Sequence, residues 1–211
     1  MKHIRKFGLV LVAAVAAMAL GGASSAMATG TTTLCKTNTT PCPVASRYAA
    51  GTVLEGLATN PTLLGKFFGI TGTISCEHSV VAGALDSAIG TPLTGTISTI
   101  SFTGNCKDSF GDTCSVNTVK TGKLDILRTG ANVGTATSLG NEILVKCSGF
   151  INMDCVFGGT PQLKAEGSPA KELTATNATL VAVSGSGCPS TPQWDALYKI
   201  IKPATDVFIS S

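Results

Sequence analysis

The chain has 211 residues, of which 44% are hydrophobic and only 13% are charged. Its formal charge of +3 comes from Lys2, Arg5 and Lys6, because basic and acidic residues are equally numerous after position 28. A near-neutral chain without blocks of like charge lacks a basic footprint, which argues against nucleic acid or an anionic membrane surface as the main partner.

The first 28 residues have the pattern of an export signal. A basic start is followed by an apolar run, Leu9–Leu20, which is too short to span a bilayer comfortably. Ala26-Met27-Ala28 is a small-x-small cleavage site. We therefore predict a cleaved signal peptide over 1–28 and no transmembrane segment in the mature chain. Residues 29–211 are expected to form one β domain that is secreted, extracellular or held in the cell envelope.

All eight cysteines follow the predicted cleavage site. An even number of cysteines in an exported chain is typical of disulfides, and no C-x₂-C spacing suggests a zinc site. Eight cysteines can be wired in 105 ways, so short separations are the only guide. They favour these pairs: Cys35–Cys42, Cys106–Cys114 and Cys147–Cys155, leaving Cys76–Cys188.

The first half of the mature chain alternates short apolar runs with breakers. The Thr-rich stretch 29–40 predicts an exposed N-terminal arm, and a first strand is expected near Thr52–Ala58. Leu63–Ile70 is compatible with a short helix, a strand or a loop. Core packing is the ordinary role for its Phe67 and Phe68. The functional alternative is a hydrophobic lip or gate for a ligand.

Two more strands are expected at 71–78 and 80–85. The stretch Leu93–Lys120 predicts a β-hairpin, because two Ile/Val/Thr-rich arms flank an Asp/Gly/Ser-rich link. We expect the Cys106–Cys114 disulfide to close the hairpin at its mouth. The link holds Asp108 and Asp112, which suggests a weak calcium site, although a solvated hairpin tip is the commoner structure.

The second half of the chain continues in the same style. Strands are expected at 123–128, 142–147 and 155–157, with one or two more at 173–183 and a final one at 207–209, separated by turns rich in Gly, Asn and Pro. The stretch Trp194–Ile201 fits both a helical and a strand spacing, and the surrounding β pattern favours a strand. Taken together, these runs predict an all-β fold, an antiparallel sandwich or barrel of short strands stapled by disulfides.

Several short motifs resemble a large group of exported, cysteine-containing, β-rich proteins from soil actinobacteria. The motifs are Leu34-Cys35…Cys42-Pro43, Tyr48…Gly51-Thr52, Ile74-Ser-Cys76-Glu-His-Ser79 and Cys188-Pro189…Trp194-Asp-Ala-Leu-Tyr198. The resemblance implies secretion and a β fold. It implies no activity, ligand or site residue.

Catalytic motifs are absent from the sequence. The chain has no G-x-S-x-G, H-E-x-x-H, Walker or G-x-G-x-x-G pattern. A hydrolase would have to use His78, the only histidine after the signal segment, and a hydrogen-bonded structural histidine is the commoner explanation. We therefore predict no catalytic residue, no metal site and no cofactor.

Three functions remain open on the sequence alone. The first is a non-catalytic β protein whose stapled loops contact a macromolecule or the envelope. The second is a β-barrel carrier of a small apolar ligand, which the low polarity of the chain would suit. The third is a secreted hydrolase that uses His78. A carrier requires inward apolar side chains that leave a cavity, whereas an interaction protein requires a filled core. The sequence does not fix the oligomeric state.

Overall fold

The computed structural model describes residues 30–211, so the predicted signal peptide lies outside the described residues. These residues form an almost purely β structure with one short 3₁₀ turn, η1 (Val44–Ser46), and the predicted all-β class is confirmed. The strands in chain order are β1 (Thr33–Cys35), β2 (Val53–Thr59), β3 (Thr62–Phe67), β4 (Ile70–Ser75), β5 (His78–Leu85), β6 (Leu93–Thr103), β7 (Cys106–Asp108), β8 (Thr113–Lys120), β9 (Lys123–Gly130), β10 (Val133–Leu139), β11 (Glu142–Cys147), β12 (Met153–Gly158), β13 (Gln162–Glu166), β14 (Glu172–Thr179), β15 (Val181–Ser186), β16 (Gln193–Lys202) and β17 (Phe208–Ser210).

Eight of these strands close into a barrel. Their order is β14-β13-β10-β9-β6-β5-β2-β16, and a further pairing of β16 with β14 completes the ring. Every neighbouring pair is antiparallel. Between the two predicted architectures the chain therefore forms the barrel, whose closure leaves no open edge in the ring.

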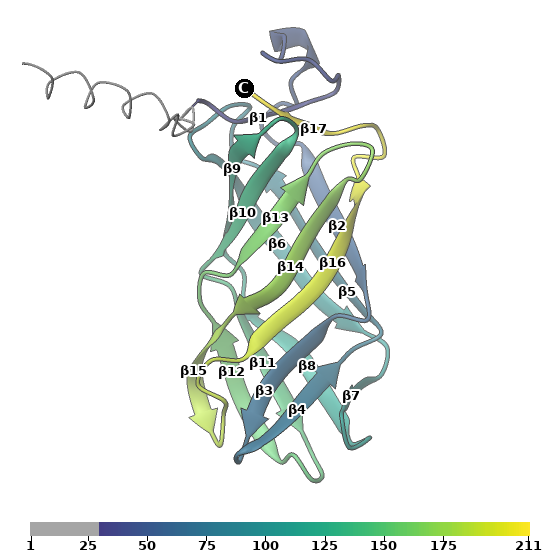
Figure 1. Cartoon of the computed structure of the whole chain (residues 1–211), viewed down its shortest axis with the longest axis vertical. Coiled ribbons are helices and arrows are strands. Elements are labelled where there is room, and N and C mark those ends of the chain that lie inside the picture. Colours follow the sequence, from purple (N-terminus) through teal and green to yellow (C-terminus); the bar gives the residue numbers. More distant parts are fainter. Residues whose placement is uncertain (1–29) are drawn as a thin grey trace, which may run out of the picture.

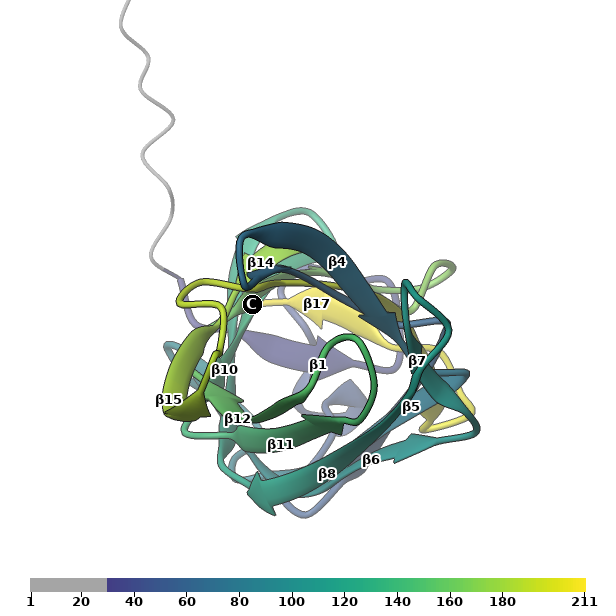
Figure 2. The ribbon, with the colours of Figure 1, turned by 90° about the horizontal axis from the view of Figure 1, so that it is seen from below.

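The remaining strands of this sheet continue below the barrel and make the molecule elongated (Figure 1). From β16 the order runs β3-β4-β7-β8-β11-β12-β15. Seen from below, these strands curve around the long axis (Figure 2). The N–H of Leu180 donates to the carbonyl of Pro192, which ties the start of β15 to the segment before β16. A buried apolar cluster that includes Leu63, Phe67, Val145 and Phe157 fills this lower part.

A separate two-stranded sheet of β1 and β17 lies across the upper end of the barrel (Figure 1). Leu34 and Ile209 are register partners in this sheet and pack on the buried cluster of the upper barrel. Thr32 and Thr33 are fully buried, and the Thr33 hydroxyl donates to the carbonyl of Ala88 at 2.6 Å. The prediction of an exposed arm over 29–40 is therefore wrong for its central part, because residues 33–35 form β1 and pair with β17. Among residues 30–40, Thr31 and 36–40 are exposed, whereas 32–35 are buried.

The four disulfides join Cys35–Cys42, Cys76–Cys106, Cys114–Cys147 and Cys155–Cys188. All eight cysteines are paired as predicted, but only the Cys35–Cys42 connection was predicted correctly. The other three predicted pairs are wrong because strand neighbours, rather than sequence neighbours, bring these cysteines together. Four disulfides fit an oxidising environment.

The stretch predicted as one long hairpin is divided between the two parts of the fold. β6 pairs with β5 and β9 in the barrel, whereas β8 pairs with β11 below it. Only the short β7 pairs with β8 as a hairpin. The long-hairpin prediction is therefore wrong, because the first arm finds longer partners elsewhere. The ambiguous stretches at 63–70 and 194–201 are both largely strand.

Candidate functional site: a cavity inside the barrel

Small side chains face the interior of the upper barrel. Because successive residues of a strand point to opposite faces, the positions that alternate with exposed ones form the inner wall. An eight-stranded barrel is just wide enough for ordinary side chains to fill it, so small inward residues leave space. The small, buried inward positions are Gly56, Ala58, Ala136, Ala165, Ala175 and Ala196.

Of these, Gly56 and Ala165 line a cavity of about 190 Å³ inside the barrel. At its upper end the wall includes Leu34 and Ile209 of the β1–β17 cap. At its lower end it includes Phe102, Phe157 and Trp194, which also pack on the lower cluster. The cavity is therefore bounded by apolar side chains at both ends.

The side wall is formed largely by leucine, isoleucine and valine. Leu54, Leu124, Leu163 and Leu173 belong to the inner wall but are only partly buried. In a filled barrel such inward leucines would be fully enclosed. Their remaining accessible surface is explained by the empty space that they face.

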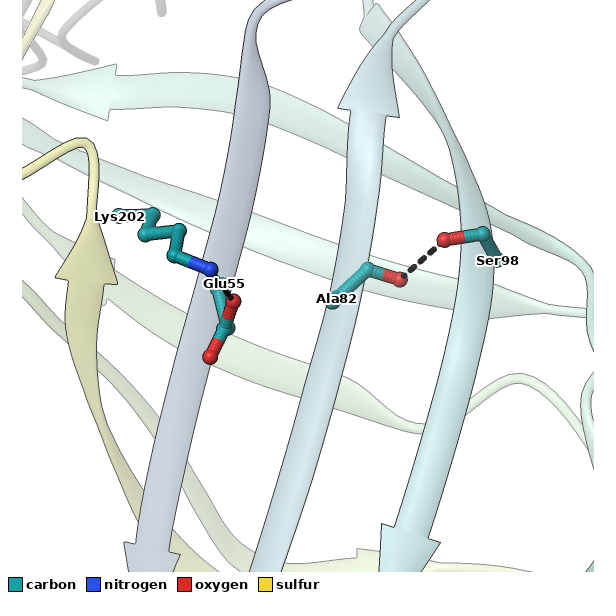
Figure 3. Close-up of polar contacts among 4 residues, drawn as sticks. All are labelled: Glu55, Ala82, Ser98 and Lys202. Carbon is teal, nitrogen blue, oxygen red and sulfur yellow. Dashed lines mark hydrogen bonds and ion pairs between the residues drawn. The ribbon is translucent and has the colours of Figure 1, made fainter.

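The charged residues of the wall have partners outside the cavity. Glu55 lies 2.6 Å from Lys202 across β2 and β16 (Figure 3), and Glu172 pairs with Lys199. The Glu166 carboxylate pairs with Lys164 at 2.9 Å. All three glutamates alternate with inward residues, and their lysine partners are 58–59% exposed. The ion pairs are therefore on the outer surface, and these residues contribute backbone to the inner wall.

Lys171, the fourth charged residue of the wall, is anchored to backbone. Its Nζ donates to the carbonyls of Pro203, Ala204 and Thr205 at 2.9–3.2 Å. With this amine and the three glutamates engaged elsewhere, none of the charged residues that line the cavity directs a free charge into it. The interior therefore suits a neutral molecule.

One polar group in the wall is a buried tyrosine. The hydroxyl of Tyr198 lies 3.1 Å from the Ser79 hydroxyl, and both residues are buried. Burial raises the pKa of Tyr198 to about 12, although hydrogen bonds with Ser79 and Trp194 oppose the shift. Tyr198 therefore remains protonated throughout the physiological pH range, and it adds no charge to the cavity.

The two phenylalanines predicted as a ligand lip lie away from this cavity. Phe67 is 2% exposed and belongs to the lower cluster, whereas Phe68 is 65% exposed on the turn between β3 and β4. Neither lines the cavity. The core role weighed for Phe67 fits its burial, and the lip role of the pair stays a prediction.

The polar candidates from the sequence lie outside the cavity wall, with His78 exposed and Asp108 only 6% exposed. His78 is exposed at the start of β5, and within the described chain its imidazole has no hydrogen-bond partner. Oδ1 of Asp108 accepts from the N–H groups of Phe110 and Asp112, so this carboxylate braces its own turn. Across residues 30–211, no three His, Cys, Asp or Glu side chains come together as a metal-binding group.

The fold thus defines a class, a closed antiparallel barrel with an apolar internal cavity. No protein-family model, curated protein or solved structure matches the chain. Within the described part of the chain, no helix is long and apolar enough to cross a membrane.

Proposed function

We propose that this protein is an exported carrier of a small, neutral, apolar molecule, which it holds inside the upper barrel. The cavity of about 190 Å³ is the observation that carries the proposal. Among the functions that the sequence left open, a carrier requires inward apolar side chains that leave a cavity. A module acting only through its surface requires a filled core.

The chemistry of the wall supports a neutral ligand. Desolvating a charged group in this interior would be unfavourable, because no free opposite charge faces it. An apolar cavity of about 150 Å³ engineered in another protein stays dry and binds benzene, so a larger space with similar walls suits a larger apolar molecule. Shape and apolar contact, rather than ion pairing, therefore supply the affinity.

The first experiment is native mass spectrometry of the exported protein. The expected result is an adduct that disappears on denaturation and whose mass identifies the ligand class. Binding of N-phenyl-1-naphthylamine, an uncharged apolar dye, is then measured by fluorescence titration. We expect saturable binding to one site per chain.

A matched pair of substitutions locates the dye. Ala165 is 2% exposed and lines the cavity, so Ala165→Phe fills the space and is expected to weaken binding by at least roughly tenfold. Ala182 is exposed on β15, so Ala182→Phe adds the same ring outside and is expected to leave binding unchanged. Equal binding by both variants, with intact near-ultraviolet circular dichroism, would refute the carrier.

A further inference from the structure

The lower end of the molecule carries three exposed phenylalanines on three separate turns. Phe68 is 65% exposed between β3 and β4, Phe110 is 48% exposed between β7 and β8, and Phe150 is 63% exposed between β11 and β12. These turns lie at the end of the molecule opposite the β1–β17 cap (Figure 1), and Figure 2 looks directly at them. We call this set of three turns the aromatic end.

Contacts between the turns hold the aromatic end in place. The rings of Phe110 and Phe150 lie 4.5 Å apart between centroids. The N–H of Phe150 donates to Oδ2 of Asp112 at 2.5 Å, which links the β11–β12 turn to the β7–β8 turn. The ring of Phe68 lies against Gly187, where an added Cβ would be 2.6 Å from its Cζ.

Disulfides brace the same region. The Cys76–Cys106 and Cys114–Cys147 bonds join the strands that carry these turns. The phenylalanines are therefore presented by ordered structure, and docking them requires little further loss of conformational entropy.

Each aromatic turn follows an exposed lysine. Lys66, Lys107 and Lys146 precede Phe68, Phe110 and Phe150 by two to four residues. Lys146 pairs with Asp154 at 2.8 Å. For Lys66 and Lys107, residues 30–211 offer no carboxylate within ion-pair distance. Lys66 and Lys107 therefore precede their aromatic turns without an ion-pair partner, while the carboxylates of Asp108 and Asp112 in the β7–β8 turn accept backbone N–H groups.

The size of the apolar surface distinguishes between possible partners. With about 200 Å² per ring, the three exposed fractions amount to roughly 350 Å² of aromatic surface. A stable protein interface buries about 800 Å² on each partner, so these tips alone are too small for a second copy of the chain. Projecting aromatic groups beside lysines instead suit the boundary between lipid headgroups and acyl chains.

We propose that the aromatic end docks on a lipid bilayer surface by inserting Phe68, Phe110 and Phe150, with Lys66 and Lys107 contacting anionic headgroups. Because the chain is nearly neutral, charge alone would not drive it to a membrane. Insertion of the three apolar rings supplies most of the affinity for the bilayer. The proposal does not depend on the carrier function, because the aromatic end lies outside the cavity wall.

The test is flotation with phosphatidylcholine vesicles, with and without phosphatidylglycerol. The full chain is expected to float with both, and more strongly with phosphatidylglycerol. Phe68→Ser and Phe150→Ser are each expected to weaken binding roughly tenfold. Lys66→Gln and Lys107→Gln should each weaken only the phosphatidylglycerol binding, by roughly fivefold. Val44→Ser, at a residue 77% exposed beside the cap, is the matched control and should bind normally.

A second measurement reports insertion directly. Tryptophan placed by Phe150→Trp should be quenched by brominated lipids, whereas Trp194, inside the fold, should not be. Absence of flotation by the unaltered chain would overturn the proposal. Concentration-dependent self-association that Phe68→Ser and Phe150→Ser abolish, without vesicle binding, would assign the aromatic end to a second copy instead. Retained dye binding by these variants would leave the carrier function standing whatever the vesicle result.

Discussion

The ring of Phe102 meets the ring of Trp194 edge to face, with centroids 5.7 Å apart and planes at 89°. Phe102 comes from β6 and Trp194 from β16, which are not neighbours in the sheet. Both residues line the cavity and pack on the lower cluster. This aromatic pair is therefore the floor that separates the hollow upper barrel from the filled lower part, and edge-to-face geometry favours the contact.

Removing this floor is expected to enlarge the cavity and loosen the fold. Phe102→Ala should lower the free energy of unfolding by roughly 2–3 kcal/mol, because the ring is only partly buried. Trp194 is the only tryptophan, so its emission reports the change directly and should shift to longer wavelength. Phe110→Ala, at an exposed turn, is the control. Unchanged emission and stability in Phe102→Ala would show that the pair does not form the floor.

The β1–β17 cap is expected to control ligand exchange. It is a separate two-stranded sheet, and the Cys35–Cys42 disulfide anchors the end of β1. Replacing both cysteines by alanine should destabilise the cap by about 2 kcal/mol and open it more often. Stopped-flow measurement should give a roughly tenfold faster release of the dye. The matched variant without the Cys155–Cys188 bond, at the lower end, should release the dye at the original rate.

The buried Tyr198 predicts a loss of stability at alkaline pH. The pKa of Tyr198 is raised to about 12 in the fold by burial, above the value of about 10 in an unfolded chain. The tyrosine hydroxyl therefore binds its proton more tightly in the folded state than in the unfolded state. The contribution of Tyr198 to the free energy of unfolding is complete below pH 10 and is lost as the pH rises towards 12.

The expected loss of stability at alkaline pH is large enough to measure by denaturant unfolding. Between about pH 9 and pH 11, the titration of Tyr198 should lower the free energy of unfolding by about 1 kcal/mol. Denaturant unfolding of Tyr198→Phe at the same pH values isolates this contribution from that of the lysines. The phenylalanine variant should lack it. An equal pH dependence in both proteins would contradict the assigned shift.

The strands and the all-β class could be predicted from local pattern, but the closure of the barrel could not. Runs rich in Val, Ile and Thr between Gly and Pro turns indicate strands because both signals act over a few residues. Closure depends on the pairing of β14 with β16 and on the join between β6 and β9, which local patterning does not encode.

The cavity could not be predicted from the sequence either, because it also depends on how the strands pair. Gly56 and Ala165 are recognisable as small residues in strands, but their effect depends on which face is inward and how wide the ring is. The stretch 63–70 was proposed as a ligand lip because its large aromatic residues are easily noticed in a sequence. Small residues leave the space for a cavity, and in a sequence they carry no comparable signal.

The disulfide pairing could be predicted only in part from the spacing of the cysteines in the sequence. Cys106 and Cys114 are register partners across β7 and β8, as a stapled hairpin would require. Cys147 is also the register partner of Cys114, and Cys76 follows the strand that pairs with β7. A row of four cysteines therefore crosses adjacent strands, and pairing the inner two would leave the outer two without a partner. Sequence separation cannot reveal such a row.

This row predicts a specific thiol exchange. Cys76→Ala leaves Cys106 as a free thiol, facing Cys114 within its disulfide to Cys147. Attack by the Cys106 thiolate on the Cys114 sulfur would form a Cys106–Cys114 bond and release Cys147 as the thiolate. Alkylation of the native variant, followed by peptide mapping, is expected to find label on both Cys106 and Cys147. Cys155→Ala is the matched control, in which label should remain on Cys188, its bonded partner. Label confined to Cys106 would show that the neighbouring bond does not exchange.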